Sequence, residues 1–354
     1  MCRQQTPLVY CPEDWCPTVV ATRAAEDLRE YRKDQLIGGR YRIIEPLGKG
    51  AATVVFDTEH IGTGQPVAIK LLSVDPRTGD GMDLIQRFFR EARICASLNH
   101  ANTVQVFDVG QDERGAMYIA MERLTGETMS KVMQRKIIAD ETLSQGETVA
   151  IALGVLEALG AAHELGLVHR DLNPANIMLC LDKDGNQNVK VLDFGVARIE
   201  NSALTRAGQL PGSPRYMSPE QCSNSKVDGR SDLYSVGCLL FALVAGRPPF
   251  EARNPISIMK KHILEPVPDV HELSSAPLSP RFVAILKRAL EKDPAARFQT
   301  AGDMRAALKQ LNVARRRSGR RMDSGSADEV RQAKVLMKMA QQADDPAVAY
   351  EYAK

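Results

Sequence analysis

The sequence predicts an α+β protein with two lobes, a small antiparallel β lobe that carries one helix and a larger, mainly helical lobe. Three observations lead to this prediction. Short segments rich in β-branched and aromatic residues fill the chain from residue 41 to about residue 124, one long amphipathic segment interrupts them, and helical periodicity dominates afterwards. With 354 residues, 44% of them hydrophobic, the chain can bury a substantial core.

The strand-like segments of the small lobe are separated by turns that contain glycine or aspartate, which is typical of an antiparallel sheet. They are residues 41–48, 53–59, 66–72, 103–110 and 117–124. The interrupting segment, residues 82–100, repeats apolar residues such as Leu84, Phe88 and Ile94 at helical spacing. We therefore expect one helix to pack on the sheet.

The larger lobe begins after residue 124. Ser144, followed three residues later by Glu147, has the form of a capping box, and apolar residues then recur at helical spacing to about Leu165. Two further strand-like segments, 177–181 and 189–194, flank a turn signal. More helices are predicted at residues 231–246, 256–264, 280–291 and 301–311.

The two ends of the chain differ from this central region. The first residues lack periodicity until a charged segment at 21–34, which suggests a short helix, and the last part opens with the basic run "RRRSGRR". The expected organisation is a partly disordered N-terminal arm at 1–38, a domain at 39–312 with a small lobe at 39–122 and a large lobe at 125–312, and a basic linker with a helical tail at 313–354.

Composition narrows the class of protein. Forty-six basic and 44 acidic residues give a formal charge of +2, so no general field attracts nucleic acid or an anionic membrane. No segment approaches the roughly 20 apolar residues of a membrane span, and the N-terminus lacks the apolar stretch of a signal peptide. Seven mostly scattered cysteines, of which only Cys2, Cys11 and Cys16 cluster, indicate reduced thiols rather than disulfides or zinc. We expect a cytoplasmic protein with no nucleic-acid partner and no membrane span.

The segment "LGKGAATVVF" places Gly48 and Gly50 between two predicted strands. Glycine lets backbone N–H groups approach a phosphate without interference from a Cβ atom, so this turn can fold over a nucleotide. An ordinary hairpin also uses two glycines, and Thr53 stands where the third glycine of G-x-G-x-x-G would be. Taken alone, the motif is a weak signal.

Lys70 ends the apolar segment "VAIK". A lysine buried on such a strand requires an anionic partner, and Glu91 on the predicted helix can supply one. The alternative is a lysine on the solvent face of an edge strand.

Three oxygen-bearing side chains form the next candidate site. Asp171 and Asn176 lie in an expected loop, and Asp193 follows a predicted strand, so the hairpin between them can bring Asn176 and Asp193 into one cleft. Carboxylate and amide oxygens suit Mg²⁺, which shares its ligands with the phosphates of a nucleotide. Asp171 is then available to accept a proton from a hydroxyl group. Each residue alone is an ordinary turn former, but their combined spacing favours a phosphate-transfer site.

The motifs "GKGAATVV", "VAIK", "HRDLNPAN", "DFG" and "SPE" occur in this order and together resemble the signature set of protein kinases. The segments "DLYSVGCLLFALVAGRPPF" and "DPAARF" are similar to a helix and the closing segment of the kinase large lobe. The resemblance covers about residues 39–312 and is strongest to bacterial serine/threonine kinases of the eukaryotic type. It implies a bilobal protein-kinase-like fold.

The resemblance also implies ATP and Mg²⁺ as cofactors, with Mn²⁺ as an alternative metal. The loop over the phosphates would consist of Gly48, Lys49, Gly50, Ala51, Ala52 and Thr53. The adenine would lie among Leu47, Val55, Ala68, Met121, Glu122, Leu124 and Met178, with Met121 as gatekeeper and the backbone of Glu122 and Leu124 as hydrogen-bonding partners. Lys70 would contact the α- and β-phosphates and be held by Glu91.

By the same resemblance, Asn176 and Asp193 would hold Mg²⁺, and Asp171 would orient and deprotonate the substrate hydroxyl. Structural roles are implied as well. Glu220 and Arg297 are expected to form a buried ion pair, and a stacked apolar spine that couples the lobes would comprise Cys95, Val106, His169 and Phe194.

The substrate class follows from the residues around the catalytic aspartate. "DLNPAN" keeps the proline of serine/threonine kinases, so we expect Ser and Thr hydroxyls of proteins as acceptors. "SPRYMSPE" resembles the peptide-positioning loop of protein kinases and disfavours a small-molecule kinase. Thr205 is the expected regulatory phosphosite, with Arg170 as the partner of its phosphate, although an unmodified loop is an equal alternative. A homodimer for autophosphorylation is also expected from the family.

One departure from the motif concerns Asn173, which stands where the family has a lysine. Electrostatic stabilisation by such a group contributes on the order of 2.7–4 kcal/mol. We therefore expect Asn173, together with Thr53, to reduce catalysis without abolishing it, because an amide can still donate a hydrogen bond. The alternative is a pseudokinase that binds a nucleotide and signals through its conformation.

Overall fold

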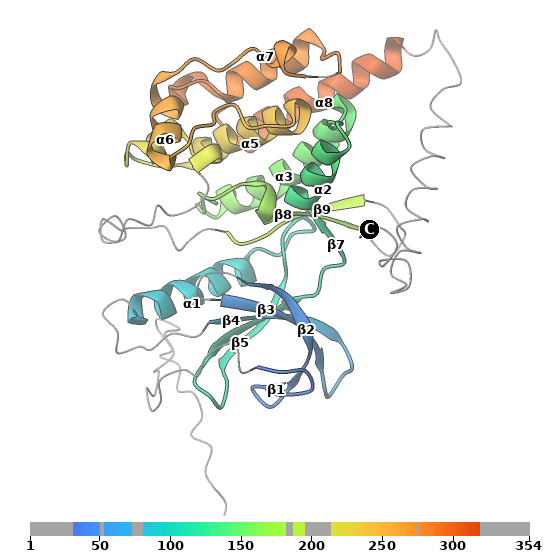
Figure 1. Cartoon of the computed structure of the whole chain (residues 1–354), viewed down its shortest axis with the longest axis vertical. Coiled ribbons are helices and arrows are strands. Elements are labelled where there is room, and N and C mark those ends of the chain that lie inside the picture. Colours follow the sequence, from blue (N-terminus) through green and yellow to red (C-terminus); the bar gives the residue numbers. More distant parts are fainter. Residues whose placement is uncertain are drawn as a thin grey trace, which may run out of the picture. The chain divides into compact units, whose positions relative to one another are not determined.

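The computed structural model describes residues 31–49, 53–72, 81–181, 187–194, 214–274 and 276–318 (Figure 1). Both lobes belong to one compact unit that ends at Leu308, and a second unit begins at Lys309. The predicted order of a β-rich lobe followed by a helical lobe is confirmed. The N-terminal cysteines, most of the predicted helix at 21–34 and the predicted tail helix lie outside the described residues.

The small lobe contains a six-stranded antiparallel sheet with the strand order β1-β2-β3-β4-β6-β5. Its strands are β1 (Leu36–Ile37), β2 (Tyr41–Lys49), β3 (Thr53–His60), β4 (Pro66–Leu72), β5 (Val106–Gln111) and β6 (Met117–Glu122). All five predicted strands are present. The sequence did not predict β1, which pairs with the start of β2 and lies before the expected domain boundary at residue 39.

Both faces of this sheet are covered in part by apolar side chains. One cluster includes Tyr31, Ile37 and Phe56, so the chain already packs on the sheet at residue 31. The other lies under helix α1 (Gly81–Ser97), where Phe88 and Ala92 meet strand residues; Figure 1 shows the helix alongside the sheet. Burial of an aromatic or aliphatic side chain stabilises the fold by roughly 1.5–3 kcal/mol, which explains why the predicted helix docks here.

One strand is shorter than predicted, for a local reason. The segment expected to begin at residue 103 enters the sheet only at Val106. The hydroxyl of Thr103 donates to the carbonyl of Leu98 at 3.0 Å, and Thr103 pairs with Val191 of the large lobe instead of with the small-lobe sheet. The loop before β5 is thereby joined to the other lobe.

The large lobe is built around a helix that is buried on all sides. Its helices are α2 (Met129–Ile138), α3 (Gln145–Glu164), α4 (Pro219–Cys222), α5 (Gly229–Ala245), α6 (Pro255–Leu264), α7 (Pro280–Ala289) and α8 (Ala301–Ser318). Residues 231–244 of α5 are all buried, which is expected of a helix without a polar face. The predicted capping box of α3 is present, since the Ser144 N–H donates to the Glu147 carboxylate at 2.8 Å.

A second, smaller sheet follows β6 in the chain and has the antiparallel order β7-β8-β9. Its strands are β7 (Gly126–Thr128), β8 (Ile177–Leu181) and β9 (Gln187–Val191). The two predicted strands are present, although β9 ends at Val191 and not at the predicted residue 194; β7 was not predicted. Gly126 has φ +154°, and a Cβ atom there would clash with the carbonyl oxygen of Leu179, so a larger residue would prevent this close pairing. None of the helices in the described ranges combines the length and apolar character that a membrane span requires.

Candidate active site

A cavity of about 440 Å³ lies between the small-lobe sheet and the β8–β9 hairpin. It brings together most of the residues predicted to bind a nucleotide: Leu47, Gly48, Val55, Ala68, Lys70, Met121, Glu122, Leu124, Met178 and Asp193. Gly50, Ala51 and Ala52 lie outside the described residues. Lys49 ends β2 and Thr53 begins β3, on either side of these three residues.

Several residues that line the cavity were not predicted from the sequence to bind a nucleotide. Its additional lining residues are Ala92, Cys95, Val104, Val106, Ile119, Arg123, Thr125, Gly126, Thr128, Lys131 and Leu192. Cys95 and Val106 were expected in the apolar spine, and the structure also places them in the wall. The others come from α1, from the loop before β5, from β6 and the segment after it, from β7, from the start of α2 and from the residue after β9, and no motif marks them.

Lys70 of β4 reaches across the cavity to the large lobe. Its Nζ lies 2.8 Å from Oδ1 of Asp193, and its side chain is only 12% exposed. Because β4 lies between β3 and β6, the alternative of a lysine on an edge strand is wrong. An amine this deeply placed needs a negative partner. Glu91 lies in α1 as predicted, but its side chain is outside the described residues, so its pairing with Lys70 stays a prediction.

The hairpin brings the two predicted metal ligands together. The Leu192 N–H donates to the Asn176 carbonyl at 2.8 Å, and Ile177 pairs with Val191, so Asp193 follows directly beside Asn176. The side-chain amide nitrogen of Asn176 donates to the Asp171 carbonyl at 2.9 Å. This contact uses the amide nitrogen, so the amide oxygen, the atom that a hard cation prefers, is the one that would bind a metal. One amide oxygen and one carboxylate next to a lysine fit a Mg²⁺ ion that also binds phosphates.

Both polar atoms of the Asn173 side chain are hydrogen-bonded within its own loop. Its amide nitrogen donates to the Asp171 carbonyl at 2.9 Å, and its amide oxygen accepts from the Ala175 N–H at 2.9 Å, where it caps the short 3₁₀ turn Pro174–Asn176. The side chain is buried. Instead of presenting an unengaged amide to a phosphoryl group, Asn173 therefore stabilises the backbone that carries Asp171.

The loop before Asp171 is held from α5. Oδ1 and Oδ2 of Asp232 each accept a backbone N–H at 2.9 Å, from Arg170 and His169 respectively. On the other side, the Gln221 amide donates to the Arg170 carbonyl at 2.7 Å. Arg170 and Asp193 both have positive φ, 64° and 45°. Strained backbone of this kind persists where surrounding contacts over-determine it, often at functional sites.

The predicted contact between His169 and Phe194 is present. Their ring centroids are 4.8 Å apart, and the Nε2 of His169 lies 3.0 Å from the Leu192 carbonyl. Both residues are buried. His169 thus connects the loop of Asp171 to the segment of Asp193 by packing, in agreement with a structural role.

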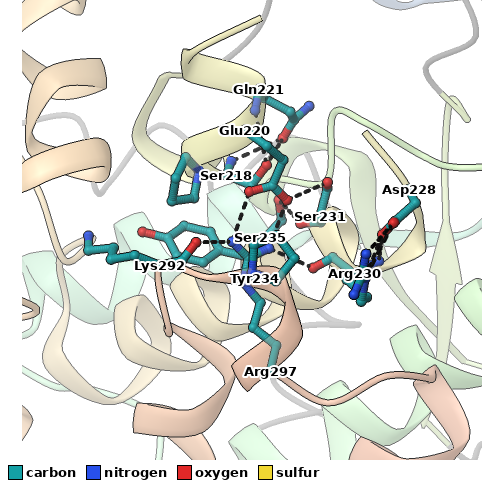
Figure 2. A network of polar contacts seen from close by, with 12 residues as sticks. Ser218, Glu220, Gln221, Asp228, Arg230, Ser231, Tyr234, Ser235, Lys292 and Arg297 are labelled. Atoms are coloured by element: carbon teal, nitrogen blue, oxygen red, sulfur yellow. Dashed lines mark hydrogen bonds and ion pairs between the residues drawn. The ribbon is translucent and has the colours of Figure 1, made fainter. Parts of the chain in front are cut away.

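Glu220 and Arg297 form the predicted buried ion pair (Figure 2). Two charge-assisted hydrogen bonds of 2.7 and 2.8 Å join them, and the Ser231 hydroxyl also donates to Glu220. Burial alone would raise the pKa of Glu220, but the hydrogen bonds from Arg297 and Ser231 lower it below its usual value. The pair fixes α4, whose Gln221 contacts the Arg170 carbonyl, against the segment before α8.

Comparison with known proteins agrees with this geometry. The family model described as "Protein kinase domain" matches residues 41–310. The chain is 38% identical over 320 residues to the serine/threonine-protein kinase pkn3 of Myxococcus xanthus, covering 88% of this chain and 56% of that protein. It is 40% identical over 281 residues to the serine/threonine-protein kinase PksC of Streptomyces coelicolor, covering 78% and 49%. It thus spans about half the length of the curated relatives it matches.

Comparison with solved structures also finds a protein kinase domain. The kinase domain of Mycobacterium tuberculosis PknI is 30% identical, covers 79% of this chain and 99% of its own, and superimposes with a TM-score of 0.62. The bilobal fold, the ordered motifs and the residues that surround the cavity therefore have one common explanation. The chain belongs to the protein kinase domain family.

Proposed function

We propose that this chain is a serine/threonine protein kinase that transfers the γ-phosphoryl group of Mg-ATP to Ser and Thr hydroxyls of proteins. The observation that carries the proposal is the contact of Lys70 with Asp193 at 2.8 Å, at the edge of an apolar cavity and beside Asn176. Relatives named as serine/threonine-protein kinases support the enzyme over the pseudokinase.

The cavity suits an adenine base. Its walls are apolar, with Val55 and Ala68 from the sheet and Met178 from β8. A flat aromatic base gains from burial between such side chains, while backbone groups at Glu122 and Leu124 border the cavity and would recognise its polar edge. Gly48 and the turn after it would then lie over the phosphates.

The polar end of the cavity suits the phosphates. Lys70 would place its charge on the α- and β-phosphates, and Asn176 and Asp193 would hold Mg²⁺, which when bound neutralises the phosphate oxygens. Asp171 would accept the proton of the substrate hydroxyl and orient that oxygen in line with the γ-phosphorus. The hydrogen bonds that Asn173 and Asn176 donate to the Asp171 carbonyl would keep this carboxylate in place.

Other parts of the proposal rest on the family resemblance. Residues 39–312 would form the catalytic domain, Thr205, which lies outside the described residues, would be phosphorylated, and Arg170 would pair with its phosphate. Autophosphorylation within a homodimer and the use of Mn²⁺ are proposed on the same basis. A cytoplasmic location and the lack of a nucleic-acid partner are proposed instead from the composition and the near-neutral charge of the sequence.

The test is a phosphotransfer assay with purified protein, γ-labelled ATP, Mg²⁺ and a general protein acceptor, repeated with Asp171→Asn. We expect label on Ser and Thr residues with the parent chain and a loss of about a hundredfold or more with the variant, the scale of a lost general base. Equal labelling by both proteins would reject the enzyme. Binding of ATP without any transfer would instead favour the pseudokinase.

A further inference from the structure

Lys190 of β9 makes an interlobe contact that the proposed catalytic mechanism does not use. Its Nζ lies 2.8 Å from Oε2 of Glu122 and 3.0 Å from the Thr103 carbonyl. The side chain is only 11% exposed, whereas that of Glu122 is 32% exposed. A lysine held this closely by a carboxylate and a carbonyl oxygen has a single favoured position.

The contact joins three segments that surround the cavity. Glu122 ends β6 at the cavity rim, Thr103 lies in the loop before β5, and Lys190 itself pairs across the β8–β9 hairpin with Met178 on the cavity floor. Other bonds reinforce this junction. The Val191 N–H donates to the Asn102 carbonyl at 2.8 Å, and the Glu122 N–H donates to the Gln105 carbonyl at 2.8 Å.

We propose that Lys190 is a positioning residue for the nucleotide base, because it fixes the backbone at Glu122 relative to Met178, the two sides between which an adenine would lie. This inference rests on the proposed function. The polar partners of Lys190 are Glu122 and Thr103, neither of which the mechanism places on the phosphates. Its contribution is therefore to recognition of the base rather than to phosphate binding or transfer.

Lys190 and Lys70 differ in the part of the ligand that each affects. Loss of Lys190 leaves the Glu122 carboxylate without its cation and lets the rim move relative to the cavity floor, which weakens every ligand that contains adenine by the same factor. Loss of Lys70 removes a charge that lies beside Asp193 and would meet the phosphates but not the base. Adenosine, which has no phosphate, is therefore affected by one change and not by the other.

The experiment measures dissociation constants of adenosine and of Mg-ATP by calorimetry for the full chain and its variants. With Lys190→Met we expect both constants to rise by a common factor of about five, the scale of a partly exposed ion pair. Lys190→Arg restores part of the affinity, since it keeps the charge. Lys70→Met weakens Mg-ATP and leaves adenosine unchanged. Lys136→Met, which breaks an exposed pair with Glu141, changes neither.

Unchanged adenosine binding by Lys190→Met overturns the inference, and so does a fall in affinity for Mg-ATP alone. If Lys190→Met does not fold, Glu122→Gln serves instead, because it removes the charge and keeps an acceptor; a smaller common loss for both ligands is then expected, and no loss overturns the inference. A parent chain that binds adenosine but transfers no phosphate rejects only the proposed function. A parent chain that binds neither ligand rejects both.

Discussion

Lys70 and Asp193 are 123 positions apart in the chain, yet their side chains meet at 2.8 Å across the boundary between the two lobes. Lys70 is nearly buried, whereas Asp193 is half exposed at the end of the β8–β9 hairpin. A contact of this kind fixes the distance between the sheet that would carry the phosphate-binding amine and the segment that would carry a metal ligand. The amine and the metal ligand would therefore face the same phosphates.

Lys70→Met should lower kcat by about 10²–10³, because one preorganised electrostatic contact to the reacting group contributes on this scale. Asp193 would remain half exposed and hydrated, so the melting temperature should change little. The measurement is phosphotransfer together with thermal unfolding. Lys136→Met is the matched control, and a variant with near-normal kcat would show that Lys70 does not act on the phosphates.

Asn173→Lys tests the departure from the family motif. A lysine adds a positive charge close to Asp171, so we expect kcat to rise by about a hundredfold, the lower end of the scale for one preorganised electrostatic contact. Loss of the two hydrogen bonds of Asn173 should lower the free energy of unfolding by about 1 kcal/mol. Asn173→Ala is the control, since it loses the same bonds without gaining a charge. If the lysine variant is no faster than the alanine variant, the missing charge does not limit the reaction.

Arg297→Ala should destabilise the fold strongly. Arg297 is fully buried and its removal leaves the Glu220 carboxylate uncompensated, which costs about 3–5 kcal/mol. Chemical denaturation measures the loss. Arg135→Ala, which breaks an exposed pair with Glu127, should cost at most about 1 kcal/mol. Similar losses for the two variants would contradict a special role for the buried pair.

The elements that the sequence predicted are those with a long local signal. Strands β2 to β6 are rich in β-branched and aromatic residues and are bounded by turn signals, and α3, α5 and α7 are long apolar or amphipathic segments, so local pattern and tertiary packing agree. Strands β1 and β7 have two and three residues, which is too short for any period to show. Their pairing depends on neighbours that only the folded chain provides.

In the candidate site, too, some features were predicted from the sequence and others were not. Motif spacing identified Lys70, Asn176 and Asp193, because the family resemblance links positions that are distant in sequence. It did not reveal that Asn173 is engaged by the Asp171 carbonyl, or that Lys190 reaches Glu122 and Thr103. These contacts depend on the conformation of a loop and on how the two lobes pack together. Neither composition nor periodicity predicts them.

A buried histidine should make the stability of the fold depend on pH. His262 of α6 is fully buried, with its ring 2.9 Å from the Tyr234 hydroxyl, and burial together with the charge of Lys292 lowers its pKa from 6.5 to about 4. As the pH falls below 6.5 the unfolded chain binds a proton at this histidine, whereas the folded chain binds it only near pH 4. The free energy of unfolding therefore falls as the pH falls through this window. Between pH 7 and pH 5 we expect a loss of about 2 kcal/mol from this group, measured by urea unfolding. The loss should disappear in His262→Gln and persist in His271→Gln, which changes an exposed histidine; an identical pH dependence in all three proteins would exclude His262 as its source.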